Sequence, residues 1–167
     1  MRVLLSKINS LNKIIFSKRT SVKFVEEGNS LAPKFNEEGL LPVVVTEESS
    51  GMVLMIGYMN EESLKRTIDT GEGCYWSRSR ELLWHKGASS GMVHQIKEML
   101  IDDDQDSLWL KVVVAGIGAS CHVGYKSCFY RSIEKNEINE LTLNFTEEEK
   151  TFDPEIVYPG SKNPTQL

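Results

Sequence analysis

The residues best suited to chemistry in this sequence begin with a cluster of thiol and imidazole side chains. Cys121 is followed directly by His122 and, after five more residues, by Cys128. Two thiolates seven residues apart, with an imidazole beside one of them, can begin a zinc site, and a catalytic zinc site has three protein ligands and an open position for water. Two buried cysteines that behave as small apolar residues would give the same pattern.

A second candidate site is the acidic run Asp102-Asp103-Asp104-Gln105-Asp106. In an extended segment, Asp102, Asp104 and Asp106 would project to one face and Asp103 to the other. Three carboxylates on one side repel one another unless a cation lies between them. Oxygen ligands at this density suit Mg²⁺ or Ca²⁺. The alternative is a solvated acidic turn.

A third cluster combines cations, aromatic rings and small residues within 16 residues, from 76 to 91. Arginine side chains bind phosphate through two parallel donors, and small residues beside them let backbone N–H groups approach an anion. Tryptophan offers a flat face for a base or ribose, and histidine can transfer protons near neutral pH. The candidates are Trp76, Ser77, Arg78, Arg80, Trp84, His85 and Lys86.

Short strands and one helix must position these clusters. Pro42–Val45 and Met52–Ile56 are β-rich runs separated by turn residues, which predicts a hairpin. Asn60 is a suitable N-cap for a helix that Gly71 ends. Further strands are predicted at 74–76, 93–100 and 107–114, with loops at 81–91 and 115–120. The fold class is therefore α+β, with mostly antiparallel short strands and one or two helices.

Three other residues receive structural predictions. Cys74 lies in an apolar run and is expected in the core, and His94 is expected to have a structural role. Trp109 lies between Leu108 and Leu110, so another chain is expected to cover one side of that strand.

Composition excludes several classes of protein. The 167 residues are 40% hydrophobic and 26% charged, as in globular domains, and no apolar run is long enough for a membrane span. The net charge of −5 argues against broad nucleic-acid binding. Three cysteines form a poor disulfide framework, which favours a reducing compartment and a cytoplasmic location.

The two ends differ in composition from the middle. Residues 1–22 are basic, with no acidic residue, so organelle targeting competes with a frayed tail or an early start codon. We divide the chain into a basic and disordered N-terminal extension at 1–30, a catalytic domain at 31–133 and an acidic, polar tail at 134–167. The tail is expected to hold at most a short helix or strand.

Several segments together identify a family resemblance. They are Gly57–Leu64, Tyr75–Arg80, Leu83–Gly91, the aspartate run, Ala119–His122 and Ser127–Arg131. In this order they resemble phosphoribosyl-AMP cyclohydrolase of histidine biosynthesis. The resemblance covers about 90 residues, from Leu41 to Arg131.

The resemblance implies a homodimer with its sites at the subunit interface. It implies Mg²⁺ on Asp102, Asp104 and Asp106, and Zn²⁺ on Cys121, Cys128 and a cysteine of the partner's aspartate motif. The family's usual D-C-D-x-D motif has Asp103 here in place of that cysteine, and the loop before Cys121 is longer than usual. A carboxylate is an acceptable zinc ligand, so we expect Asp103 of the partner chain to be the third ligand, with Cys74 or a histidine as the alternative. This harder ligand set should make zinc less exclusively preferred.

The implied reaction is hydrolysis of the N1–C6 bond of the adenine ring of phosphoribosyl-AMP by zinc-activated water, the third step of histidine biosynthesis. His122 or His85 would transfer protons, and His122 is preferred because its neighbour holds the metal. Arg78, Arg80 and Lys86 would hold the two phosphates. The alternatives are a non-catalytic, metal-stabilised nucleotide-binding module and a zinc deaminase, although the H-x-E and P-C-x-x-C motifs of the deaminases do not occur.

Overall fold

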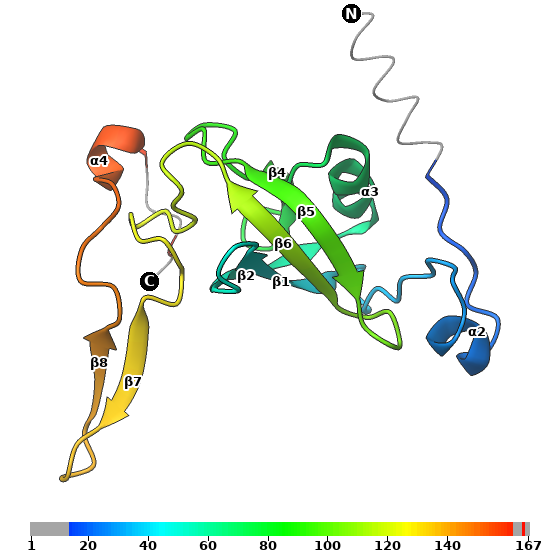
Figure 1. Ribbon diagram of the computed structural model, residues 1–167, viewed down its shortest axis with the longest axis horizontal. Helices are drawn as coiled ribbons and strands as arrows, with labels where there is room; N and C mark the ends of the chain where they lie inside the picture. Colours follow the sequence, from blue (N-terminus) through cyan, green and yellow to red (C-terminus); the bar gives the residue numbers. More distant parts are fainter. Residues whose placement is uncertain (1–13, 162–164, 166–167) are drawn as a thin grey trace, which may run out of the picture.

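The computed structural model describes residues 14–161 and 165 (Figure 1). The part of residues 1–22 that precedes residue 14 lies outside the described residues. The elements, in chain order, are α2 (Val22–Glu26), β1 (Leu41–Glu47), β2 (Val53–Met59), α3 (Glu61–Thr70), β3 (Cys74–Ser77), β4 (Leu82–His85), β5 (His94–Ile101), β6 (Leu108–Val114), β7 (Arg131–Lys135), β8 (Leu141–Phe145) and α4 (Pro154–Val157). This composition confirms the α+β class.

A four-stranded sheet in the order β2-β1-β6-β5 forms the centre of the molecule. The β1–β2 hairpin and the β5–β6 pair are antiparallel, whereas β1 and β6 are parallel. The predicted hairpin is confirmed, and Gly51 adopts the positive φ of 73° that its turn requires. Most strand pairs are antiparallel, as predicted.

One face of this sheet packs in the hydrophobic core. Alternate residues of β1 and β6 point to it, since successive side chains of a strand project to opposite faces. Leu64 of α3 and Tyr75 of β3 complete the packing. The buried cluster contains Leu41, Val43, Val45, Leu54, Met55, Met59, Leu64, Tyr75, Leu108, Leu110 and Val112.

Helix α3 begins and ends as predicted. The Asn60 side chain accepts a hydrogen bond from the Ser63 N–H, and Gly71 ends the helix in the left-handed conformation. The buried Thr67 hydroxyl accepts from the Cys74 N–H at 3.0 Å, which joins the helix to β3. Cys74 itself is buried, as predicted.

Strand β4 corrects the prediction of a loop over 81–91. Leu82–His85 pair with β3 in an antiparallel hairpin, and only the residues around that strand are turn or loop. Glu81, at a φ of 50°, makes the reversal between the strands. The small residues of Gly87–Gly91, just after this short apolar run, concealed it in the sequence.

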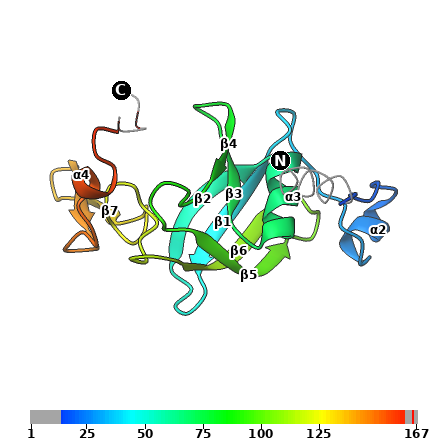
Figure 2. The ribbon, with the colours of Figure 1, turned by 90° about the horizontal axis from the view of Figure 1, so that it is seen from above.

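The segment after Arg131 has more structure than the expected tail. Strands β7 and β8 form a separate hairpin that projects from one end of the molecule, while α2 lies at the opposite end (Figures 1 and 2). The chain then returns toward the body, where Phe152 is buried with Met92 and Ala119. None of the described helices is long and apolar enough to span a membrane.

Candidate active site and metal-ligand clusters

A cavity of about 670 Å³ lies between β2, the β3–β4 hairpin, the loop that carries Cys121 and Cys128, and the C-terminal segment. It brings together most of the residues that the sequence singled out for chemistry. Those that line it are Trp76, Ser77, Arg78, Arg80, Trp84, Lys86, His122 and Cys128.

Cations and aromatic rings alternate along the β3–β4 side of the cavity. The Arg78 guanidinium lies 4.0 Å from the centre of the Tyr58 ring. The Arg80 guanidinium lies 5.9 Å from the Trp84 ring and donates from Nε to Ser77 Oγ at 3.1 Å. Both arginine residues are exposed. Their guanidinium groups therefore combine a cation–π contact with donors that face solvent, an arrangement suited to an anionic nucleotide.

Lys86 differs from these arginines because it is only 4% exposed. Burial lowers the pKa of its ammonium group, and the nearby Cys128 and Cys121 sulfurs oppose that shift. Its Nζ lies 5.8 Å from the Trp84 ring. Lys86 is thus a buried cation beside the thiols rather than a surface cation like Arg78 and Arg80.

The two cysteines lie close enough to interact directly. A hydrogen bond from the Cys128 thiol lowers the pKa of Cys121 to about 6, helped by the Val123 N–H and the Lys86 charge, and it raises the pKa of Cys128. Cys121 is buried and Cys128 is exposed toward the cavity. A thiolate stabilised in this way is a suitable metal ligand.

The three histidines are separated by the fold. His122 is half-buried and lines the cavity. His85 is not among the described residues that line it, because Trp84 and His85 alternate on β4 and point to opposite faces. Its Nε2 lies 2.9 Å from a carboxylate oxygen of Glu72.

The structural role predicted for His94 is confirmed. His94 is fully buried, its Nδ1 is 2.9 Å from the Tyr75 hydroxyl, and its Nε2 is 3.0 Å from Ser120 Oγ. Burial lowers its pKa to about 3, so the ring is neutral at pH 7. It therefore connects the core to the residue before Cys121.

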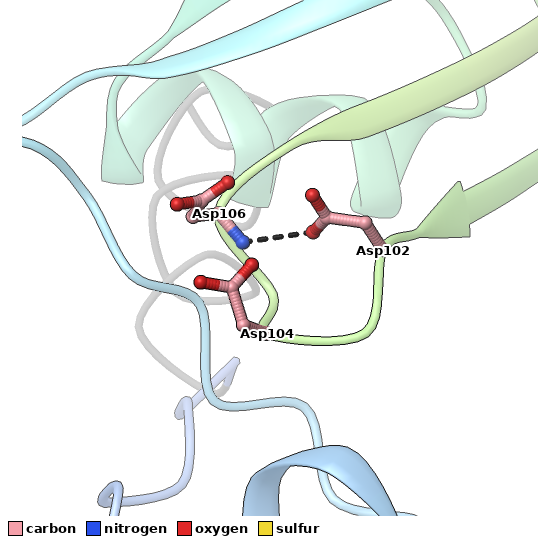
Figure 3. A group of neighbouring side chains, drawn as sticks. All are labelled: Asp102, Asp104 and Asp106. Atoms are coloured by element: carbon pink, nitrogen blue, oxygen red, sulfur yellow. Dashed lines mark hydrogen bonds between the residues drawn. The ribbon is translucent and has the colours of Figure 1, made fainter.

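Asp102, Asp104 and Asp106 converge as predicted, but a turn brings them together and not the alternation of an extended strand. Asp102, Asp104 and Asp106 lie in the β5–β6 turn, and one ligand oxygen of each lies within 4.8 Å of the others (Figure 3). Asp102 Oδ1 accepts hydrogen bonds from the N–H groups of Asp106 at 2.9 Å and Ser107 at 3.0 Å. Within residues 14–161 and 165, this is the one group of three or more potential metal ligands.

The acidic turn is joined to the N-terminal segment. Lys34 Nζ lies 3.1 Å from Asp104 and 3.2 Å from Asp106, and these contacts hold the pKa of Asp106 below its usual value. The buried Gln105 side chain accepts from the Ala32 N–H and donates to the Val25 carbonyl. Residues 25–34 thus pack on the turn, although they were assigned in part to a disordered extension.

Asp103 lies on the same acidic turn and is exposed. The turn precedes β6, whereas Cys121 and Cys128 follow it, and a strand of that length spans roughly 20 Å. Among the described residues of one chain, Asp103, Cys121 and Cys128 do not form a group of potential metal ligands.

Sequence reasoning missed the C-terminal contribution to the cavity. Lys150, Pro154, Glu155 and Tyr158 line it, and all lie in the segment expected to be a tail. The one local sign of structure there is Asp153 before Pro154, a helix start in which Asp153 accepts from the Glu155 N–H. Nothing in the sequence indicates that this helix lies against the cavity.

Comparison with known proteins gives a consistent result. The family model described as phosphoribosyl-AMP cyclohydrolase matches residues 55–130. A phosphoribosyl-AMP cyclohydrolase of Rhodopseudomonas palustris strain HaA2 is 51% identical over 134 residues, which are 80% of this chain and 90% of the relative. Proteins of the same name from Nitrobacter winogradskyi and Nitrobacter hamburgensis are 48% and 46% identical, again over 80% of this chain and 90% of the relative.

Proposed function

This chain belongs to the phosphoribosyl-AMP cyclohydrolase family, and we propose that it opens the adenine ring of its substrate in the cavity between β2, the β3–β4 hairpin and the cysteine loop. It is a hydrolase of histidine biosynthesis that cleaves a cyclic amidine. The observation that carries the proposal is one cavity lined by exposed arginines, two tryptophans, a histidine and a thiol.

The substrate is a nucleotide with two phosphates, so the site must hold anions and a flat base. Arg78 and Arg80 are the proposed phosphate ligands, since both are exposed and keep donors available beside the aromatic rings. Trp76 and Trp84 are the proposed surfaces for the base or ribose. Ser77 also lines the cavity and is a proposed substrate-binding residue. Lys86 is assigned to the buried end of the site, next to the sulfurs.

Two sets of side chains have the donor chemistry of metal ligands. The thiols of Cys121 and Cys128 suit zinc, and the convergent oxygens of Asp102, Asp104 and Asp106 suit magnesium. When bound, zinc would supply a Lewis acid that lowers the pKa of a water molecule. Asp103 of a second copy is the proposed third zinc ligand, in place of the family's cysteine.

Ring opening requires proton transfer at two atoms. Water adds at C6, the C6–N1 bond breaks, and N1 leaves with a proton, which gives an imidazole carboxamide and a formamidine. We assign His122 to take the proton from water and return one to N1, because His122 lines the cavity and follows a proposed metal ligand. His85 is less suited, since it lies near Glu72 on the other face of β4.

We propose a homodimer, because the two ligand sets are separate in one chain. A second copy could supply the acidic turn that one chain cannot bring to its own cysteines. Val44, Ile56 and Trp109 are adjacent in register on the outer face of the sheet, and all three are exposed. The β7–β8 hairpin exposes Ile133, Leu141 and Phe145. These apolar surfaces support covering by another copy, as expected for Trp109.

The cytoplasm is the proposed location, because Cys74, Cys121 and Cys128 are all free thiols. Organelle targeting by residues 1–22 would place the same enzyme in another reducing compartment.

The test is turnover of phosphoribosyl-AMP by the purified protein before zinc removal, after chelation and after zinc is added back. We expect turnover to disappear with zinc and to return with it. Folded, zinc-loaded protein without turnover would contradict the proposal and would favour a non-catalytic nucleotide-binding module. Full turnover without zinc would contradict the metal assignment.

A further inference from the structure

The loop that carries Cys121 and Cys128 has three backbone hydrogen bonds of its own. The Cys121 N–H donates to the Tyr125 carbonyl at 3.1 Å, and the Gly124 N–H donates to the Cys121 carbonyl at 3.1 Å. The Ser120 N–H also donates to the Lys126 carbonyl at 2.9 Å, but none of these three bonds uses the N–H groups of Lys126, Ser127 or Cys128. The N–H groups of the three residues that end at Cys128 therefore take their acceptors from outside the loop.

Strand β2 holds one side of the loop. The Cys128 N–H donates to the Leu54 carbonyl at 2.8 Å, and the Ser127 hydroxyl donates to the Val53 carbonyl at 2.7 Å. These contacts fix the backbone at Cys128 and the side chain of Ser127. They do not involve the backbone N–H groups of Lys126 and Ser127.

Glu147 supplies those partners from the segment after β8. Its Oε2 accepts from the Lys126 N–H at 2.8 Å, and its Oε1 accepts from the Ser127 N–H at 2.9 Å. One carboxylate thus satisfies two consecutive N–H groups, and hydrogen bonds to a charged acceptor are about twice as strong as neutral ones. Glu147 is half-buried, which limits competition from water.

The residues that follow Glu147 extend this contact. The Thr151 N–H donates to the Gly124 carbonyl at 2.7 Å, and Phe152 is buried. Gly124 adopts a φ of 106°, and a Cβ there would lie 2.3 Å from the Phe152 carbonyl oxygen. The loop and this segment approach so closely that each restricts the other.

We propose that Thr146–Phe152 is a strap that holds the cysteine loop in its metal-ligating shape, with Glu147 as the positioning residue. The proposal rests on the assignment of Cys121 and Cys128 as zinc ligands. It gives a function to a segment beyond the residues matched by the family model, which end at 130. Lys150 of the strap lines the cavity, and so does Tyr158, which follows the strap in the chain.

Glu147→Ala removes both acceptors, Glu147→Gln keeps one, and Glu148→Gln is the matched control, because Glu148 is an exposed neighbour of the same charge. Zinc affinity is measured by competition with a chromophoric chelator. Thiolate coordination is measured from the sulfur-to-metal charge-transfer band of the cobalt-substituted protein. Thermal unfolding of the metal-free proteins reports the stability of the fold.

We expect Glu147→Ala to lower zinc affinity by about tenfold or more and to weaken the cobalt band, as is typical of outer-shell partners. Glu147→Gln should recover part of the affinity, and Glu148→Gln should match the unchanged protein. If Glu147→Ala does not fold, the contrast between Glu147→Gln and Glu148→Gln carries the test.

Unchanged affinity in the Glu147 variants would overturn the proposal, as would an equal loss in Glu148→Gln. A lower unfolding temperature with an unchanged cobalt band would also overturn it, because the strap would then support the fold and not the thiols. Failure of the proposed function gives a different result, in which the unmodified protein shows no thiolate band at all.

Discussion

The turn before β6 and the loop after it carry different ligands and are held in different ways. The turn offers carboxylates that are partly exposed and balanced by Lys34 at the surface. The loop offers thiols, and it is connected to the fully buried His94 through Ser120. Hard and soft ligands are thus assigned to opposite ends of one strand. In the proposed site, the two sets come from two copies of the chain.

Of the changes at the two ends of β6, loss of one thiol from the cysteine loop should have the largest effect on activity. Cys128→Ser is expected to release zinc and to reduce kcat by about a thousandfold, since several kcal/mol of transition-state stabilisation is lost. Cys74→Ser is the control, because Cys74 is a buried thiol of β3. Metal analysis and turnover are measured on both variants. Cys128→Ser protein that keeps its zinc would contradict the assignment of Cys128 as a zinc ligand.

The next effect separates substrate binding from metal binding. Arg78→Ala is expected to lower kcat/KM by about 10- to 100-fold, the effect of losing a charged hydrogen bond, while zinc content stays unchanged. Arg66→Ala is the control, because Arg66 is an arginine of α3 paired with Glu62. Equal kcat/KM values in the two variants would place the phosphates elsewhere.

The buried connection at the thiol end predicts a pH dependence. The pKa of His94 is about 3 in the folded protein against an ordinary value of 6.5. The unfolded chain therefore binds a proton that the folded chain does not, between these two values, and stability falls as pH decreases through that range. The slope from this residue is up to about 1.4 kcal/mol per pH unit. Urea unfolding of the unmodified protein and His94→Gln at pH 7 and pH 5 should show a smaller decrease for the variant, and equal decreases would refute this role.

The exposed ion pairs of Lys34 at the acidic turn predict a smaller effect, which is a gain in metal affinity. Lys34→Met removes a cation that lies 3.1 Å from Asp104 and 3.2 Å from Asp106. Since exposed ion pairs contribute little, Mg²⁺ binding should strengthen by only about two- to fivefold. Calorimetric Mg²⁺ titration of this variant and of Lys97→Met, an exposed lysine of β5, checks it. Weaker Mg²⁺ binding in Lys34→Met would contradict the view that Lys34 competes with the metal.

Sequence reasoning was most successful where one local rule acts alone. Partial alternation over 107–114 predicted a strand there, and β6 spans Leu108–Val114. The cap at Asn60 predicted the start of α3. Convergence of the aspartates was also predicted, although through an extended segment, and Figure 3 shows a turn in which Asp102 accepts from the Asp106 N–H.

The parts that were not predicted depend on partners far apart in the chain. Because β4 was missed, the opposite faces of Trp84 and His85 could not be foreseen. Glu147 lies in a charged run without periodicity, and it binds backbone N–H groups about 20 residues earlier, which carry no side-chain signature. Such contacts have no local pattern.

The most direct test of the central claim, that two chains share each site, uses heterodimers purified through two different tags. One chain carries Asp104→Asn and the other carries Cys128→Ser, and each homodimer is expected to be inactive. In the heterodimer, one of the two sites combines an intact acidic turn with an intact cysteine loop, so about half of the unmodified turnover should return. A heterodimer as inactive as either homodimer would contradict the claim that the two ends of β6 meet across a subunit interface.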